Sequence, residues 1–231
     1  PYRRQRQMCI RDSEECGAAI YQKGFPWGMV TNGLYLSHER FQRLLAAGLH
    51  TATVSLDGFA QEHNWMRGHS HSFDKAVNAI KCMAETPGFI FDVVTCANNR
   101  NFPYLEELKE FLIENGVKRW RIFTIFPVGR AANDPDLQLS GERFREVMEF
   151  IKRSRKEGRI HVSYGCEGFL GNYEGEVRDH FFSCQAGITV GSVLINGAIS
   201  GCPSIRADYH QGNIYEDDFM EVWERKFYPH R

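Results

Sequence analysis

The chain has 231 residues, and its 28 Lys and Arg nearly balance its 29 Asp and Glu. A net charge near zero gives no support for nucleic acid or an anionic membrane as the main partner. No apolar run approaches the roughly 20 residues that cross a bilayer, and no secretory segment is recognisable, so we expect a cytoplasmic protein. Seven cysteines, an odd number, do not suit a secreted disulfide framework.

Residues 1–13 contain four Arg and show little apolar periodicity. We expect a non-native or disordered tail, similar to translated adapter sequence at the end of a gene fragment, and exclude it from the fold. A genuine basic arm is the alternative. The lack of an initiator Met favours a truncated start.

Short apolar runs then alternate with amphipathic segments. Apolar and β-branched runs predict strands at 27–30, 51–56, 89–95, 120–126 and 160–163. Apolar residues at helical spacing predict helices at 36–47, 73–84, 104–114 and 141–156. This alternation predicts an α/β fold with a parallel sheet over residues 14–160, either open or closed into a barrel. No glycine-rich phosphate loop is present, which argues against a nucleotide-binding doubly wound fold.

Four predicted strands end in polar or glycine-containing motifs, at 31–33, 55–58, 95–99 and 127–130. Each motif alone is typical of a turn. The carboxyl ends of parallel strands share one edge of a sheet. Four polar motifs at these ends therefore favour a common ligand-binding face.

The order of these motifs resembles the middle of a radical S-adenosylmethionine (SAM) barrel. The resemblance lies in Thr31-Asn32-Gly33, Ser55-Leu56-Asp57-Gly58, Glu62-His63-Asn64, Arg67-Gly68 and Pro127-x-Gly129-Arg130-Ala131. It implies a partial (β/α)6 TIM-like barrel that holds SAM across the strand ends. Asn32, Ser55 and Asp57 would lie beside SAM, and Arg67 would pair with the SAM carboxylate.

Radical SAM enzymes hold a [4Fe–4S] cluster on three cysteines spaced CxxxCxxC, and no three cysteines here have that spacing. We expect the chain to be inactive by itself. Either the gene is truncated or the protein is a degenerate member of the family; the start of the chain favours truncation.

After residue 160 the strand–helix alternation gives way to a glycine-rich stretch. Asn196-Gly197, between two β-rich runs, predicts a hairpin that brings Cys184 and Cys202 together as half of a metal site. Twelve residues separate Cys184 from Gly197, and four separate Gly197 from Cys202. This spacing resembles the start of a SPASM domain, the auxiliary iron–sulfur module of many radical SAM enzymes.

That resemblance implies an incomplete SPASM half-domain over residues 161–231, cut at its C-terminus. Cys166 would be a third ligand, with a structural Cys as the alternative. Cys82, on an apolar helix face, and Cys96, at a strand end, are expected in the core.

The resemblance predicts a fragment of an enzyme that cleaves SAM to a 5′-deoxyadenosyl radical and modifies a peptide or protein. Its cofactors would be SAM and [4Fe–4S] clusters, with a flavodoxin or ferredoxin as electron donor, and neither nucleic acid nor membrane as partner. One alternative is a non-catalytic metal- or peptide-binding module derived from that fold. Another is an ordinary barrel enzyme with Asp57 or His63 as its base.

Overall fold

The computed structural model describes residues 12–165, 168–204 and 209–228. These residues fall into two compact units, with the division between residues 181 and 182. Among the described residues, no helix is long and apolar enough to cross a membrane.

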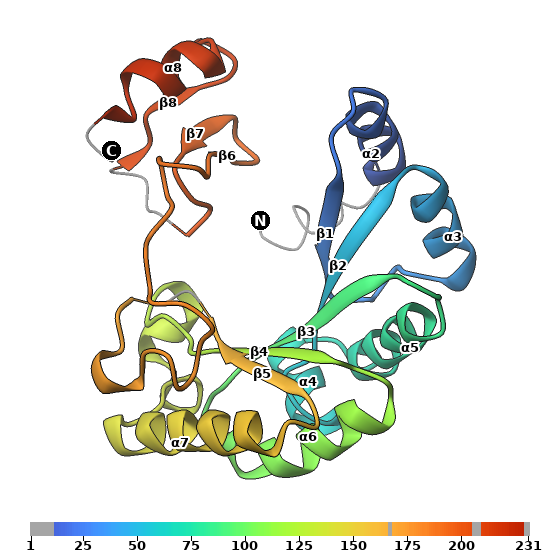
Figure 1. Cartoon of the computed structure of the whole chain (residues 1–231), viewed down its shortest axis with the longest axis vertical. Helices are drawn as coiled ribbons and strands as arrows, with labels where there is room; N and C mark the ends of the chain where they lie inside the picture. The colour runs from blue at the N-terminus through green and yellow to red at the C-terminus, as the bar shows by residue number, and fades with distance from the viewer. Residues whose placement is uncertain (1–11, 166–167, 205–208, 229–231) are drawn as a thin grey trace. The chain divides into compact units, whose positions relative to one another are not determined.

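The larger unit is built on a parallel five-stranded sheet (Figure 1). The strands lie side by side in sequence order: β1 (Trp27–Thr31), β2 (Leu49–Ser55), β3 (Ile90–Cys96), β4 (Arg119–Phe123) and β5 (His161–Tyr164). Every neighbouring pair is parallel, so all carboxyl ends meet at one edge. The α/β fold expected from the alternating pattern is confirmed.

Helices connect the strands. They are α2 (Ser13–Gln22), α3 (His38–Ala46), α4 (Ala60–Arg67), α5 (Ser72–Ala84), α6 (Leu105–Glu114) and α7 (Gly141–Glu157), with 3-10 turns η1 (Phe102–Tyr104), η2 (Gly129–Asn133), η3 (Pro135–Leu137) and η4 (Gly171–Tyr173). Ser37 and Ser140 cap α3 and α7 by accepting backbone N–H groups three residues on. The helix at 13–22 begins inside the segment 1–13 that the sequence suggested was a tail, and residues 1–11 lie outside the described residues.

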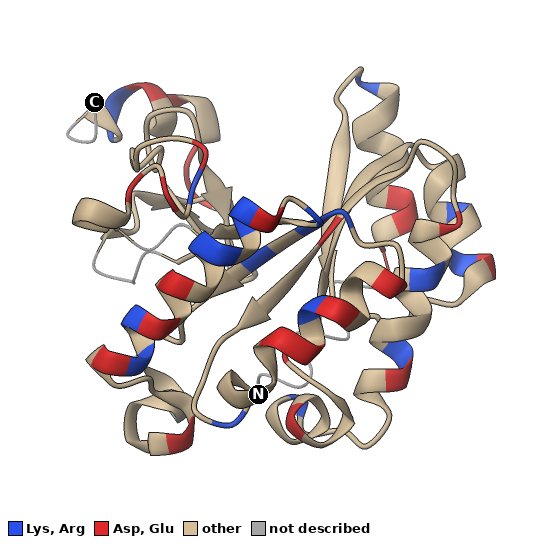
Figure 2. Ribbon diagram, turned by 60° about the horizontal axis from the view of Figure 1, so that its bottom comes forward, with Lys and Arg blue, Asp and Glu red and all other residues tan. Residues whose placement is uncertain are grey.

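One face of the sheet is covered by helices and forms the apolar core. Strand residues on this face alternate with less buried ones, as in Val93, Trp120, Ile122 and Val162, all fully buried. The Trp120 indole N–H donates to Thr95 Oγ1 at 2.8 Å. The largest core side chain therefore buries its polar N–H with a hydrogen-bond partner. Acidic and basic residues are interspersed along the helices (Figure 2).

The sheet extends past residue 160, where the sequence suggested a domain boundary. β5 hydrogen-bonds to β4 in register, and the Tyr164 N–H donates to the carbonyl of Val177 at 2.8 Å. Residues 161–181 therefore pack with the larger unit.

The smaller unit contains a three-stranded antiparallel sheet. Its elements are β6 (Ser192–Val193), β7 (Ala198–Ser200), β8 (Gly212–Asn213) and α8 (Phe219–Arg225). Ile199, Val222 and Phe227 form its small core. β6 and β7 pair as the expected hairpin, with Gly197 at φ +83° in the turn.

Candidate active site at the strand ends

Asp57 is fully buried just after β2, and its carboxylate is completely engaged. Oδ2 accepts hydrogen bonds from Arg67 Nε at 2.6 Å and lies 2.5 Å from Arg67 Nη2. Oδ1 accepts the Cys96 N–H at 3.0 Å. A buried charge is tolerated when it is paired and hydrogen-bonded in this way. Asp57 therefore ties the ends of β2 and β3 to α4.

His63 supports the same turn from α4. Its Nδ1 accepts the backbone N–H of Asp57 at 2.9 Å, in a fully buried position. Burial lowers the pKa of His63 to about 4, so the imidazole is neutral near pH 7 and carries its proton on Nε2. Nε2 has no hydrogen-bond partner among the described residues. Both Asp57 and His63 thus hold the turn, which argues against either as a base that meets a substrate.

Asn101 completes this turn and was missed in the sequence. Its Nδ2 donates to the carbonyl oxygens of Asp57 at 2.7 Å and Cys96 at 2.9 Å. Asn98 Oδ1 in turn accepts the Asn101 N–H at 3.1 Å. The run of Asn residues after β3 was the available signal, since Asn side chains bond to local backbone at turns.

Asn32 and Ser55 lie at the ends of neighbouring strands. Thr31 pairs with Val54 in the β1–β2 register, so Asn32 and Ser55 each follow a paired residue. Asn32 Oδ1 accepts the Leu34 N–H at 3.1 Å in a local turn. Ser55 is buried, and its hydroxyl has no hydrogen-bond partner among the described side chains and backbone.

Arg67 lines a cavity of about 350 Å³. Trp65 and Met66 of α4 line one side, and Val128 and Ala131 from the segment after β4 line another. Arg67 and the segment 128–131, which are far apart in sequence, therefore meet at this cavity. Since Asp57 engages Nε and Nη2, Nη1 of Arg67 is the donor left for a ligand. The residues that line this cavity do not include Asn32 or Ser55.

Cys184 and Cys202 belong to the smaller unit, and both are free thiols. Gly201 packs against the backbone of Ala186 and Gly187, where a Cβ would lie 2.8 Å from the Gly187 nitrogen. This contact brings the segment after Cys184 beside the segment before Cys202. Cys166 lies outside the described residues. Within the described ranges, no three His, Cys, Asp or Glu side chains form a metal-binding group.

The remaining cysteines differ in their surroundings. Cys82 on α5 packs against the main core and burial raises the pKa of its thiol. Cys96 is half-buried at the end of β3 and uses its backbone N–H to bind Asp57. Cys16 is exposed on α2.

A parallel sheet with helix crossovers and polar side chains at its carboxyl edge defines this unit as a partial α/β barrel. The structure of Streptococcus suis SuiB bound to S-adenosylmethionine has the same fold: TM-score 0.66, 16% identity, 91% of this chain covered and 50% of that chain. No family model matches the chain.

Two curated relatives are similar to this chain in amino-acid sequence. An AdoMet-dependent heme synthase of Nitratidesulfovibrio vulgaris is 24% identical over 234 residues, covering 94% of this chain and 63% of its own length. Mycofactocin maturase MftC of Mycolicibacterium smegmatis is 27% identical over 203 residues, covering 84% and 50%. The chain therefore spans about half to two thirds of their length. These relatives and neighbours are radical SAM enzymes, which confirms the resemblance seen in the motifs.

Proposed function

We propose that this chain supplies the SAM-binding edge of a radical SAM enzyme. The observation that carries the proposal is the meeting of Arg67 with residues 128–131 around one cavity at the carboxyl ends of the strands. Arg67 is pre-oriented by Asp57 and keeps one donor edge for a carboxylate. Ser55 and Asn32 would contact SAM from the ends of β2 and β1.

Once reduced by an electron from an iron–sulfur cluster, bound SAM would supply hydrogen-atom abstraction from the substrate. The residues of this chain would bind and orient SAM, and the fixed Asp57–Arg67 pair would prevent the arginine from moving away from the carboxylate. No three cysteines here have the CxxxCxxC spacing. A polypeptide of these 231 residues would therefore bind SAM without cleaving it.

For the smaller unit we propose part of an auxiliary iron–sulfur site. Cys184 and Cys202 are its ligands, because their thiols are free and the contact at Gly201 brings their segments together. Two thiols do not complete a four-thiolate cluster, so further ligands are required. Cys166 is the proposed third.

The proposed substrate is a residue of a peptide or protein. MftC is named as a maturase, and SuiB has been solved bound to precursor peptide SuiA. A flavodoxin or ferredoxin is the proposed electron donor. A second candidate substrate is a tetrapyrrole, because relatives also include an Fe-coproporphyrin III synthase of Methanosarcina barkeri, 26% identical over 234 residues.

Titration of the full chain with SAM by calorimetry tests the binding proposal. We expect saturable binding to one site, weakened in Ser55→Ala. Thr51→Val, four residues earlier on the same strand and face, is the matched control and should bind SAM as the parent does. Absence of binding, or equal losses in both variants, would contradict a site at the strand ends.

A further inference from the structure

The five strands of the larger sheet contain only three Asp, Glu, Lys or Arg residues: Asp92, Arg119 and Arg121. Their sequence neighbours Val93, Trp120 and Ile122 are fully buried in the apolar core. Because successive strand residues point to opposite faces, the three charged side chains face away from that core. Asp92 is the most buried of the three, and its ion pair with Arg121 offsets the cost of burying its charge. Their clustering on the face opposite the helix-covered core indicates a polar site.

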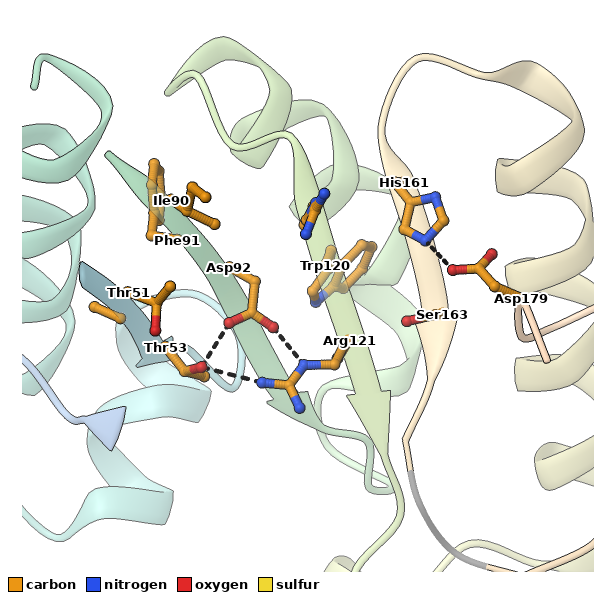
Figure 3. Close-up of a pocket in the computed structure, with 12 residues that line it drawn as sticks. Thr51, Thr53, Ile90, Phe91, Asp92, Trp120, Arg121, His161, Ser163 and Asp179 are labelled. Atoms are coloured by element: carbon orange, nitrogen blue, oxygen red, sulfur yellow. Dashed lines mark hydrogen bonds and ion pairs between the residues drawn. The ribbon is translucent and has the colours of Figure 1, made fainter. Parts of the chain in front are cut away.

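These residues line a cavity of about 460 Å³ (Figure 3). Its floor is formed by β2, β3, β4 and β5, which contribute Thr51, Thr53, Asp92, Arg121 and Ser163. Figure 3 shows the side chains of Thr53, Asp92 and Arg121 directed toward one another across three neighbouring strands. This cavity shares no lining residue with the one beside Arg67.

Each oxygen of the two acidic groups at the cavity already has a donor in contact. Asp92 accepts the Thr53 hydroxyl on Oδ1 at 2.6 Å, and Arg121 Nε binds its Oδ2. At the other end, Arg155 donates to Asp179 Oδ1 at 2.7 Å, and His161 Nε2 lies 3.0 Å from Oδ2. Neither carboxylate has an oxygen left without a donor.

The basic groups, in contrast, have donors to spare. Arg121 uses Nε on Asp92 and Nη2 on Thr53 Oγ1 at 3.0 Å, which leaves Nη1. Arg119 lines the same cavity, and its guanidinium has no hydrogen bond or ion pair within the described part of the chain. Counting Arg155, which binds Asp179 from outside the lining, three guanidinium groups accompany two carboxylates here.

We propose that this cavity binds a carboxylate group of the substrate, with Arg119 and Arg121 Nη1 as its donors. An excess of arginine donors over acceptors, on a rigid sheet, suits a carboxylate because the guanidinium fork matches its two oxygens. The inference rests on the proposed function, since it names the substrate class of that enzyme. An acidic peptide side chain and a tetrapyrrole propionate share this chemistry.

The test titrates the full chain with two carboxylate probes and their neutral counterparts. The probes are a short C-terminally amidated peptide with Glu as its one carboxylate, the same peptide with Gln, coproporphyrin and coproporphyrin amide. Arg119→Gln is the diagnostic variant, because Arg119 is exposed and its loss leaves no buried partner unpaired. Lys118→Gln is the matched control, since it removes the same charge from the neighbouring residue, which does not line the cavity.

We expect at least one carboxylate probe to bind and its affinity to fall about tenfold or more in Arg119→Gln. Binding in Lys118→Gln should stay within about twofold, and the neutral counterpart should bind weakly. The stronger of the two carboxylate probes identifies the source. Binding of neither probe, equal losses in the two variants, or equal binding of the neutral compounds would overturn the inference.

SAM titration of the same proteins separates this inference from the proposed function. SAM binding without carboxylate binding overturns the cavity assignment alone. Carboxylate binding that depends on Arg119, without SAM binding, supports the cavity and removes the radical SAM assignment.

Discussion

Arg67 contacts one oxygen of the buried Asp57 through both Nε, at 2.6 Å, and Nη2, at 2.5 Å. The same guanidinium lines the cavity at the strand ends. Arg67 therefore has a structural role and a proposed binding role in one side chain. Variants at this position change both, and the two effects must be separated by experiment.

Replacing Arg67 with Ala should lower the free energy of unfolding by about 3–5 kcal/mol, because Asp57 is left buried without its partner. The double variant Asp57→Asn with Arg67→Ala should be more stable than the sum of the single losses predicts, since it removes the unpaired charge. Urea unfolding of the four proteins gives the coupling energy. Additive losses would show that the pair contributes nothing as a pair.

Acidification should destabilise the larger unit through His63. Burial lowers its folded pKa to about 4, below the unfolded value of about 6.5. The unfolded chain therefore binds the proton more readily, and the stabilisation is complete above pH ~6.5 and is lost as pH falls toward ~4, by up to about 3 kcal/mol. Urea unfolding from pH 8 to pH 4 measures it.

His63→Gln, which keeps an acceptor for the Asp57 N–H but does not titrate, should lose this part of the pH dependence. His161→Gln is the comparison, because His161 is exposed and its variant should keep the His63 slope. An identical pH profile in His63→Gln and the parent would contradict the assignment.

Anaerobic reconstitution with iron and sulfide should load the smaller unit through its two free thiols. Cys184→Ser and Cys202→Ser should each reduce bound iron and the absorbance of the charge-transfer band. Cys82→Ser, in the main core, should leave both unchanged. Equal iron in all four proteins would mean that the expected half-site is not a ligand pair.

Gly197→Ala should destabilise the hairpin of the smaller unit. Its φ is +83°, and a Cβ would lie 2.6 Å from the ring of Tyr215. We expect a loss of more than about 1 kcal/mol. Gly141→Ala, with open space around its Cβ, should be nearly neutral. Thermal unfolding of the two variants and the parent measures the difference in stability. If Gly197→Ala is as stable as the parent, the turn relaxes to accept a Cβ, which would contradict this prediction.

The sequence was sufficient for the sheet, because apolar runs and capping residues are local signals. Strand and helix bounds agree with the structure to within a few residues at most positions, as in α3 after Ser37 and α7 after Ser140. The helix α4 at residues 60–67 was not predicted. Only Glu62 and His63 of this helix are buried, so it has no apolar stripe to reveal it.

The sites were harder to predict because they depend on contacts between distant residues. The motif order indicated Asp57 and Arg67, but not that they pair with each other. Asn101 and the Asp92–Arg121 pair were missed entirely. A single charged residue in an apolar strand was the signal for Asp92. Its partners depend on the register of both neighbouring strands: Thr53 lies opposite Asp92 on β2, whereas Arg121 lies opposite Val94 on β4 and reaches Asp92 diagonally.

The central claim is that SAM binds at the carboxyl edge of the five-stranded sheet. The most direct measurement is ¹⁵N NMR of the full chain during a SAM titration. SAM binding at this edge should shift the amide signals of Asn32, Ser55, Arg67 and residues 128–131, and should leave those of the smaller unit unchanged. Saturable shifts confined to other residues, or no shifts at millimolar SAM, would contradict it.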